Sequence, residues 1–457
     1  MNQTSVHKEN KMGVMPVNKL LLSMSLPMMV SMLVQALYNI VDSMFVARIN
    51  ENALTAVSLA FPIQMLLTAF GVGTGVGVNA LLSRSLGEKD FKTANRAAAN
   101  GLFLSVVTYL VFLVVGLFIA RPFYLSQTKD EQIVEYGVQY LSIVCIFSIG
   151  MLLQMMLEKL LQSTGKTMFT MITQSTGAVI NIVFDPILIF GLFGFPKMGI
   201  AGAAAATIFG QCVSCVMAII FNLKFNREIS LNLKGFKPDL QIIGKIYAVG
   251  LPSIVMQAIG SVMNYGMNRI LIGFSSTATA VFGVYYKVQS FVFMPVFGLN
   301  NGMVPIIAYN YGAGKKDRVI RTVRLSVMYA VLIMAAGVAV FQLAPKFLLG
   351  LFAASDHMLE IGVPALRIIS LSFLFAAFGI VSSSFFQALG NGVYSMFVSL
   401  TRQLIVLLPV AFLLSMTGNV QMVWFAFPIA EIFSFALSIF FTVRITKKVV
   451  NHIGEQE

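Results

Sequence analysis

Hydrophobic residues fill the chain in long blocks, and charged or Gly/Pro-containing segments separate one block from the next. A bilayer core about 30 Å thick takes roughly 20 helical residues, and each block is long enough to cross it. We therefore predict twelve transmembrane helices, whose ends carry an error of a few residues. The predicted spans are 19–47, 53–83, 97–119, 136–162, 168–193, 199–223, 243–273, 278–306, 321–344, 359–388, 394–416 and 421–445.

The composition supports this prediction, because 58% of the 457 residues are hydrophobic and only 11% are charged. With a mean hydropathy of +0.85, it excludes a water-soluble globule and predicts an all-α integral membrane protein. The polar segment before Lys19 runs straight into a full-length span without a small-residue cleavage site, so we expect no cleaved signal peptide.

The net charge of +13 could indicate nucleic-acid binding, but its distribution favours membrane orientation. Of the 31 lysine and arginine residues, 22 fall on the side that carries both termini, whereas 7 fall on the other side. This excess places both termini in the cytoplasm of a bacterial-type cell membrane. The basic segment 315–324 is accordingly interpreted as a cytoplasmic loop that faces anionic membrane lipids, and we expect no nucleic-acid partner.

The chain repeats itself at an offset near 225 residues. Such a repeat predicts two pseudo-symmetric six-helix lobes related by an axis along the membrane normal. We predict an N-terminal lobe over 1–223, a cytoplasmic linker over 224–242 and a C-terminal lobe over 243–457. The duplication suits alternating access about a central site, although it would also suit a large helical scaffold. The matching positions are Leu26-Pro27 with Leu251-Pro252, Tyr38-Asn39 with Met263-Asn264, Gln64 with Gln289, Leu86-Gly87 with Tyr311-Gly312, Gln162 with Gln387, and Gly165 with Gly390.

Asp185 is the most informative residue, because its apolar stretch 178–190 places a carboxylate at membrane depth. An ionisable group there is costly, so it is a functional-site hypothesis by default. Asn181 lies one helical turn earlier and puts an amide on the same face. Pro186 follows directly, so the polar cluster is predicted to coincide with a bend or a loosened turn.

Asp42 is the predicted partner of Asp185, since both acids lie in the first lobe and the second lobe has no acid at either matching position. Two such carboxylates near one another would hold a proton or a metal cation. Oxygens of Asp42, Asn181 and Asp185, with Thr207, would suit H⁺ or a hard ion such as Na⁺. The alternative is a structural polar network between bent helices.

Glu158 is a second acid at membrane depth, with Gln154 and Gln162 one turn away on either side. Facing a central cavity, it could pair with a cationic substrate, and we assign Gln154, Tyr38 and Asn39 to the same substrate site. Near the cytoplasmic end, it could instead pair with Lys159 or Lys166. Sequence does not assign roles to the other charges within the spans, Lys287, Arg402 and Glu431.

Several segments together resemble the multidrug and toxic compound extrusion (MATE) family, in its prokaryotic DinF-like and Mep-type branch. They are Leu26-Pro27 with Tyr38-Asn-Ile-Val-Asp42, Glu158-Lys-Leu-Leu-Gln-Ser-Thr-Gly165, Asn181-Ile-Val-Phe-Asp-Pro186, Gly199-Ile-Ala-Gly-Ala-Ala-Ala-Ala-Thr207 and Tyr286-Lys-Val-Gln-Ser-Phe-Val-Phe-Met-Pro295.

The resemblance implies twelve helices in two lobes and export of cationic amphiphilic compounds driven by H⁺ or Na⁺ antiport. It implies a cation or proton site at Asp42, Asn181, Asp185 and Thr207, and a substrate role for Glu158. The chain departs from the NorM-like pattern, because the spans around Asn264 and 382–384 lack the acids expected there.

We therefore expect a monomeric, ion-coupled multidrug exporter that contributes to antibiotic resistance, with no cofactor and no catalytic residues. Ion binding would bend the first helix at Pro27 and expel the drug. No Gly-rich loop ending in GK[ST] is present, so an ion gradient must supply the work. The alternatives are a flippase for a lipid-linked precursor of the same superfamily, an ion channel and an intramembrane enzyme.

Overall fold

The computed structural model describes residues 9–352 and 354–454, which form helices joined by short turns and loops and contain no strand. The all-α fold predicted from the sequence is confirmed. The first half comprises α1 (Lys11–Val14), α2 (Val17–Ala47), α3 (Glu51–Gly87), α4 (Phe91–Val114) with η1 (Val115–Ile119) and α5 (Ala120–Gln127), α6 (Glu131–Ile146), α7 (Ile149–Ser163), α8 (Thr167–Phe190) and α9 (Ile200–Phe225).

The second half repeats this order after the segment 226–239. It comprises α10 (Leu240–Ile272), α11 (Ser276–Gly312), α12 (Lys316–Leu343), α13 (Pro345–Gly350), α14 (Asp356–Ser370), α15 (Phe373–Ala388), α16 (Gly392–Leu400) with η2 (Thr401–Leu407) and α17 (Leu408–Ser415), α18 (Val420–Val423), α19 (Ala426–Lys448) and η3 (Val450–His452). Ten spans of this part of the chain are long and apolar enough to cross a membrane, and two bent helix pairs raise the number to twelve if each pair is one span.

The two bent pairs are α6 with α7, at 45°, and α14 with α15, at 50°. The sequence predicted each pair as one span, 136–162 and 359–388, and did not predict the bend within it. At the breaks, Ser148 donates a hydrogen bond to the carbonyl of Cys145 (2.8 Å) and Ser372 donates one to the carbonyl of Ile369 (2.6 Å). A serine hydroxyl that bonds the preceding turn competes with the helical ladder. The two breaks lie 224 residues apart, so they belong to the repeat.

Neither Pro27 nor Pro186 ends its helix, because α2 and α8 continue through them. The bend at Pro186 that the sequence favoured is not a break of the helix, and a role for Pro27 in bending stays a prediction. The predicted span 168–193 is too long, since α8 ends at Phe190. Gly191 follows with φ of 72°, a left-handed conformation that glycine adopts readily and that stops a helix.

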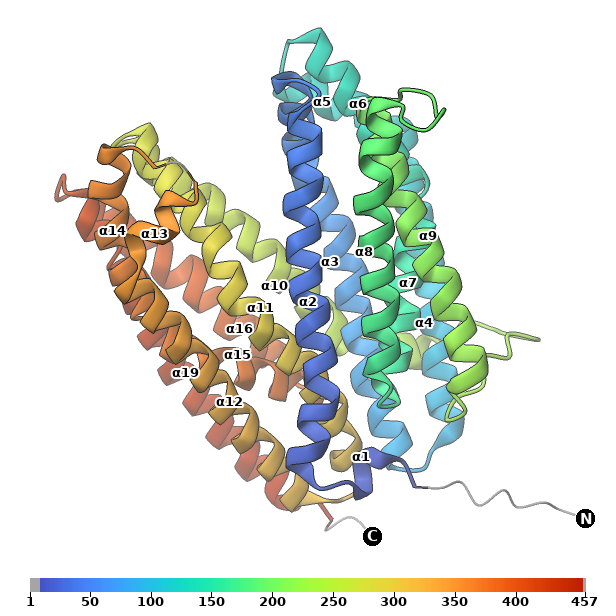
Figure 1. Cartoon of the computed structure of the whole chain (residues 1–457). Coiled ribbons are helices and arrows are strands. Elements are labelled where there is room, and N and C mark those ends of the chain that lie inside the picture. Colours follow the sequence, from blue (N-terminus) through green and yellow to red (C-terminus); the bar gives the residue numbers. More distant parts are fainter. Residues whose placement is uncertain (1–8, 353, 455–457) are drawn as a thin grey trace, which may run out of the picture.

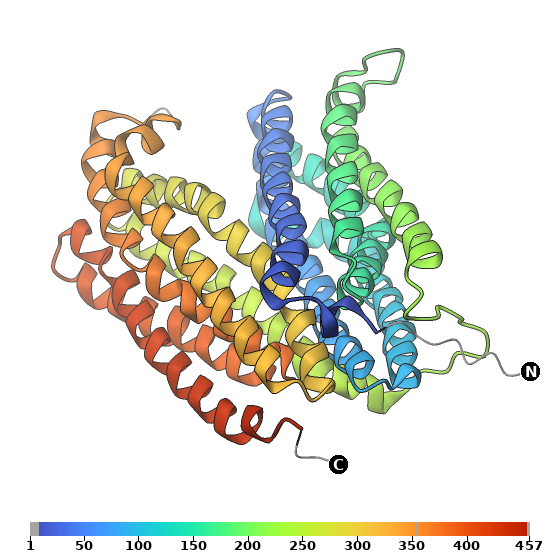
Figure 2. The same cartoon turned by 60° about the horizontal axis from the view of Figure 1, so that its bottom comes forward.

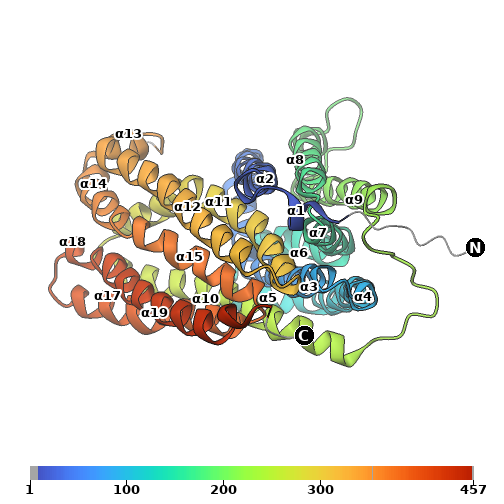
Figure 3. The same cartoon turned by 90° about the horizontal axis from the view of Figure 1, so that it is seen from below.

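The helices form two bundles, α2 to α9 in blue to green and α10 to α19 in yellow-green to red (Figure 1). They lie close together at the end that carries both termini and diverge toward the other end. Viewed from below, the segment between α9 and α10 runs around the outside of the molecule from one bundle to the other (Figure 3). The two predicted lobes are therefore present, and their division at 224–242 stays a prediction.

Glycines allow the two lobes to touch backbone to backbone near the termini. A Cβ atom on Gly87 of α3 would lie 2.0 Å from the carbonyl oxygen of Tyr309, and one on Gly312 of α11 would lie 2.1 Å from that of Arg84. At the offset of 225, Gly312 corresponds to Gly87 and Tyr309 corresponds to Arg84. The same contact is therefore made twice, once by a glycine of each lobe. The lobes therefore pack about a pseudo-two-fold axis.

Residues 9–15, here termed the N-terminal strap, cross from one lobe to the other under this contact (Figure 2). The side chain of Asn10 donates to the carbonyl of Thr164 (3.0 Å) in the N-terminal lobe. From the C-terminal lobe, Asn310 donates to the carbonyl of Met12 (2.9 Å), and Arg318 donates to the same oxygen (2.9 Å). The strap thus hydrogen-bonds to both lobes at the end of the molecule where the lobes meet and both termini lie, here termed the closed end.

Candidate functional site

The N-terminal lobe contains a buried polar cluster on α2, α8 and α9. Asn181 and Asp185 lie one turn apart on α8, and the side chain of Asp185 has no exposed surface. The hydrogen-bond network favours the Asn181 amide orientation in which Nδ2 donates to Asp185 Oδ2 (2.9 Å). In this orientation, Oδ1 accepts from the backbone N–H (2.9 Å) and the hydroxyl (3.0 Å) of Thr207. Asn181 therefore joins the carboxyl of Asp185 to α9.

Asp42 of α2 is partly exposed and lies next to this cluster, since its carboxyl is among the groups that act on Asp185. Within the described ranges, Asp185 Oδ1 accepts no hydrogen bond, and no basic side chain is among the groups that act on either carboxyl. Two carboxylates in contact repel strongly unless a proton or a cation lies between them. The structure brings together all four residues that the sequence assigned to ion coupling.

The two carboxylates of the acid pair supply oxygen atoms, which suit a proton or a hard cation. Asn181 presents its Nδ2 to Asp185, and its oxygen is taken by Thr207. Among residues 9–352 and 354–454, no group of three or more His, Cys, Asp or Glu side chains could hold a metal ion.

Two tyrosines lie near the acid pair. Thr207, Asp42 and Asp185 are among the groups that act on the hydroxyl of Tyr38, which the sequence assigned to the substrate site. Tyr140 of α6 accepts a hydrogen bond from Gln64 of α3 (3.0 Å), and Asp42 and Tyr38 are among the groups that act on its hydroxyl. The sequence had not assigned Tyr140 or Gln64 to a site. The recurrence of Gln64 as Gln289 was the available signal.

Glu158 forms a second buried polar cluster about three turns away, and 2% of its surface is exposed. Its Oε1 accepts from Gln154 Nε2 (3.0 Å) and from the hydroxyl of Thr173 (2.7 Å), and its Oε2 accepts from Gln174 Nε2 (2.7 Å). Gln174 in turn accepts a hydrogen bond from Ser31 of α2. Neutral donors therefore satisfy this carboxylate, and the predicted neighbour Gln154 is one of them.

The two lysines that could have neutralised Glu158 make other contacts. Lys159 donates to Gln162 Oε1 (2.9 Å) and to Asn301 Oδ1 of the other lobe (3.0 Å), and Lys166 pairs with Glu228 (2.7 Å). Glu158 thus has no ion pair among the described residues. Asn39, also assigned to substrate binding, is exposed, and neither polar cluster includes its side chain.

The clusters of Glu158 and Asp185 are linked by the same pair of helices. Thr173 and Asn181 are eight residues apart on α8, which corresponds to about 12 Å along the helix axis. On α2, Ser31 reaches the Glu158 cluster and Asp42 reaches the acid pair. A displacement of α2 against α8 would therefore alter both clusters at once.

The C-terminal lobe has a different arrangement of charges. Arg402 Nη1 and Glu431 Oε1 form an ion pair at 3.2 Å. The ammonium of Lys287 lies 5.9 Å from the ring centroid of Phe352, a cation–π contact. The two basic residues within the predicted spans thus have identified partners, and neither of them lies against the acid pair of the N-terminal lobe.

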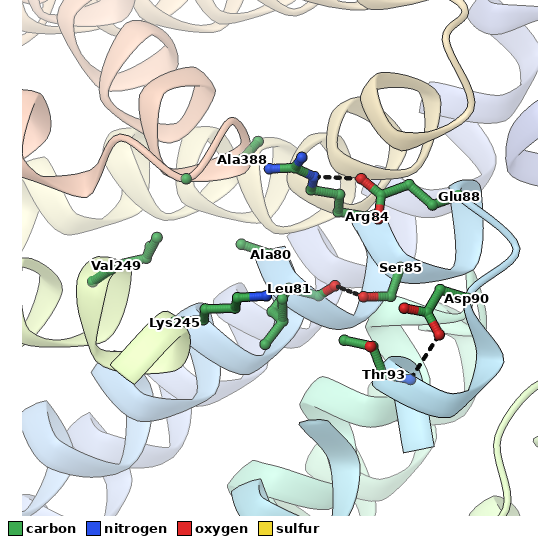
Figure 4. A pocket seen from close by; sticks show the side chains of 13 residues that line it. Ala80, Leu81, Arg84, Ser85, Glu88, Asp90, Thr93, Lys245, Val249 and Ala388 are labelled. Carbon is green, nitrogen blue, oxygen red and sulfur yellow. Dashed lines mark hydrogen bonds and ion pairs between the residues drawn. The ribbon is translucent and has the colours of Figure 1, made fainter. Parts of the chain in front are cut away.

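A pocket of about 360 Å³ opens at the closed end, between the α3–α4 turn, α10 and the turn before α16 (Figure 4). Its charged groups bind one another, since Arg84 pairs with Glu88 (2.8 Å) and Asp90 accepts from the backbone N–H of Thr93 (3.0 Å). Lys245 also lines it. None of the predicted site residues does, so this pocket is not the predicted site.

Two repeated lobes of membrane-spanning helices, one with buried and unneutralised carboxylates, define a multi-pass membrane transporter. The sequence model of the MatE family matches residues 27–187 and again residues 252–413, which supports the duplication independently. The chain belongs to the MatE family, and the predicted relationship to MATE exporters of the Mep type is confirmed.

The chain is 28% identical over 408 residues to the multidrug export protein MepA of Staphylococcus haemolyticus, covering 89% of each chain. Its fold is similar to the outward-facing conformation of a multidrug resistance MATE family transporter of the MOP superfamily, with a TM-score of 0.90, 24% identity and coverage of 96% of this chain and 98% of that one. It is also similar to a MATE structure in the bent conformation, with a TM-score of 0.87, 25% identity and coverage of 95% and 97%.

Proposed function

We propose that this protein is a secondary active multidrug exporter that moves organic cations, including amphiphilic drugs, outward in exchange for H⁺ or Na⁺. The observation that carries the proposal is the proximity of the partly exposed Asp42 to the fully buried Asp185, an acid pair on which no basic side chain acts and which occurs in one lobe only. Membership of the MatE family and likeness to a MepA multidrug export protein agree with it.

The coupling ion binds between the carboxyls of Asp42 and Asp185, with Asn181 and Thr207 completing the site. Binding relieves the repulsion between the two carboxylates and draws α2 toward α8. Bending of α2 at Pro27, which lies inside this helix, is part of this step. Bending displaces α2 from the Glu158 cluster through Ser31, and the drug leaves.

The substrate site centres on Glu158, with Gln154 as one of its partners. An arriving organic cation replaces neutral hydrogen-bond donors with an opposite charge, which stabilises the buried carboxylate more strongly. Because the lobes meet at the end that carries the termini, the shape corresponds to an outward-open state with both termini in the cytoplasm. The protein acts as a monomer in the cell membrane, with lobes 1–223 and 243–457 rocking about the linker 224–242.

The proposal is tested by drug resistance in cells that express the wild type or Asp42→Asn. The variant should abolish resistance while its abundance in the membrane stays unchanged, and unimpaired resistance would contradict the ion-coupling role of Asp42. Efflux of a fluorescent cationic dye separates the exporter from a lipid-precursor flippase, which would move no dye.

A further inference from the structure

The C-terminal lobe has an ion pair at the position where the N-terminal lobe has its acid site. Thr207 and Glu431 are 224 residues apart, and Pro186 and Pro409 are 223 residues apart, so two of the three helices of the acid site, α8 and α9, recur here. Their counterparts are the span made of α16, η2 and α17, which contacts α10, and α19, which contacts that span. Where the first lobe places Thr207, the second lobe therefore places an acid, Glu431.

This acid is held by one basic group. Arg402 Nη1 lies 3.2 Å from Glu431 Oε1, and the two side chains are 26% and 12% exposed, respectively. Glu431 Oε2 is buried and accepts no hydrogen bond from the residues that the structure describes. Half of the carboxylate is thus unsatisfied, and the guanidinium of Arg402 supplies the positive charge that the N-terminal site lacks.

The other groups around the pair are neutral. From α11, Tyr285 faces both Glu431 and Arg402, and Tyr286 faces Arg402 while bonding to Asn264 of α10. Tyr285 donates to Gln289 Oε1 (2.6 Å), so it does not donate to Glu431. Neither α15 nor α17, which also pack in this region, carries a titratable side chain.

The backbone of η2 explains how arginine reaches this position. Residues 401–407 form a π-helical stretch, whereas the corresponding part of α8 is α-helical. The wider turn shifts side chains around the helix axis and occurs mainly at functional positions. Arg402 is its second residue, and the next residue, Gln403, is buried toward Gly260 of α10. The π-helical stretch η2 thus contains Arg402, the residue that brings a positive charge to this lobe.

We propose that the guanidinium of Arg402 permanently occupies a second cation site, at Glu431. It thereby restricts binding of the coupling ion to the N-terminal lobe. This inference rests on the proposed function, because it assumes that the acid pair of Asp42 and Asp185 binds the mobile ion. Glu431 then exchanges no ion during transport. The two lobes share one architecture. The coupling ion can leave the acid pair of the N-terminal lobe, whereas the guanidinium of Arg402 cannot leave Glu431 of the C-terminal lobe.

The test uses Trp424, the only tryptophan of the chain, which is buried in the turn before α19, seven residues before Glu431. Its fluorescence is followed in purified full-length protein that carries Asp42→Asn and Asp185→Asn, so that the acid pair of the N-terminal lobe can bind neither a proton nor Na⁺. Arg402→Gln and Arg402→Gln/Glu431→Gln are added to this background. Sodium chloride is titrated against choline chloride at constant ionic strength, and pH is titrated separately.

With Arg402 present, the fluorescence should respond to neither titration. Arg402→Gln should create one saturable transition, because Glu431 is then free to take a proton or Na⁺, and the added Glu431→Gln should remove it. A transition with Arg402 present, or none in Arg402→Gln that remains folded by size-exclusion chromatography, would overturn the proposal.

A second measurement does not depend on the stability of Arg402→Gln. The number of ions exchanged per drug in proteoliposomes should be the same for the wild type and for Arg402→Gln/Glu431→Gln, in which both charges are absent. A loss of one ion per drug would show that Glu431 is itself a coupling residue, while the proposed exporter function would stand. If the wild type moves no drug, the exporter proposal fails, and the fluorescence titration still decides the role of Arg402.

Discussion

The carboxylates without an ion pair, Glu158, Asp42 and Asp185, are the residues on which the proposed function depends. Glu158 accepts hydrogen bonds from neutral donors, and Asp42 and Asp185 lie near each other. A buried charge is costly unless it is paired, so each of these sites gains free energy when a cation or a proton arrives. This difference separates them from Glu431, which is already paired with Arg402.

Glu158→Gln is expected to weaken binding of a cationic drug by about ten- to a hundredfold, since a charged partner contributes roughly 1.5–3 kcal/mol. Binding of the coupling ion should stay unchanged, because the acid pair lies about three turns away. Equilibrium dye binding to purified protein measures the first effect. Glu135→Gln, which alters an exposed acid on α6, is the matched control, and equal affinity in the two variants would refute the assignment.

Thr207→Val is expected to weaken ion binding by up to about tenfold, because it removes the hydroxyl that bonds to Asn181 and Tyr38. Thr207→Ser retains the hydroxyl and should restore binding. Isothermal titration with Na⁺, and drug-induced proton release in weakly buffered protein, would record the difference. If Thr207→Val binds the ion as the wild type does, the hydroxyl is no part of the site.

At the scale of the helices, the apolar pattern predicted the spans well but not their irregularities. Hydrophobic length locates a span, whereas the breaks at Ser148 and Ser372 carry hydrogen bonds from a side chain to its own backbone, which leave no mark on hydropathy. At Pro186 the helix α8 continues, and the predicted loosened turn stays a prediction. The assignment of Tyr38 to the substrate site also stays a prediction, because residues on one helix face can reach different neighbours.

Gly87→Ala is expected to destabilise the closed end, because the new Cβ would meet the carbonyl oxygen of Tyr309 in the other lobe. Overpacking of this kind costs about 1–3 kcal/mol. Gly244→Ala on α10 is the matched control, since nothing lies within 4 Å of its Cβ. Thermal unfolding in detergent should show a lower Tm for Gly87→Ala than for the control, and equal values would contradict the packing.

For the molecule as a whole, the N-terminal strap is an element that joins the two lobes at the end that carries the termini. Its bonds to Thr164 in one lobe and to Asn310 in the other span the closed end. Beside it, the Lys315 ammonium holds the pKa of the Glu9 carboxyl below its usual value. This pair stabilises the strap above the unfolded pKa of Glu9, and the contribution is lost as pH falls through the lowered value.

Arg318→Gln is expected to loosen the strap, because Arg318 donates to the carbonyls of Met12 (2.9 Å) and Met15 (2.7 Å). Loss of charge-assisted hydrogen bonds worth about 1.5–3 kcal/mol should speed amide hydrogen exchange in residues 11–15 by roughly ten- to a hundredfold. Arg321→Gln changes an exposed arginine on the same helix and should leave exchange unchanged. Equal exchange in both variants would show that the strap is held by other contacts.

Coupling of ion entry to drug export by the acid pair of the N-terminal lobe can be measured as efflux of a fluorescent cationic dye from proteoliposomes. Na⁺ and pH gradients are imposed separately on the wild type, Asp42→Asn, Asp185→Asn and the control Glu135→Gln. We expect at least one gradient to drive efflux by the wild type and by Glu135→Gln, and neither gradient to drive it in the two aspartate variants. Gradient-driven efflux by Asp42→Asn and Asp185→Asn at the wild-type rate would contradict coupling by the acid pair.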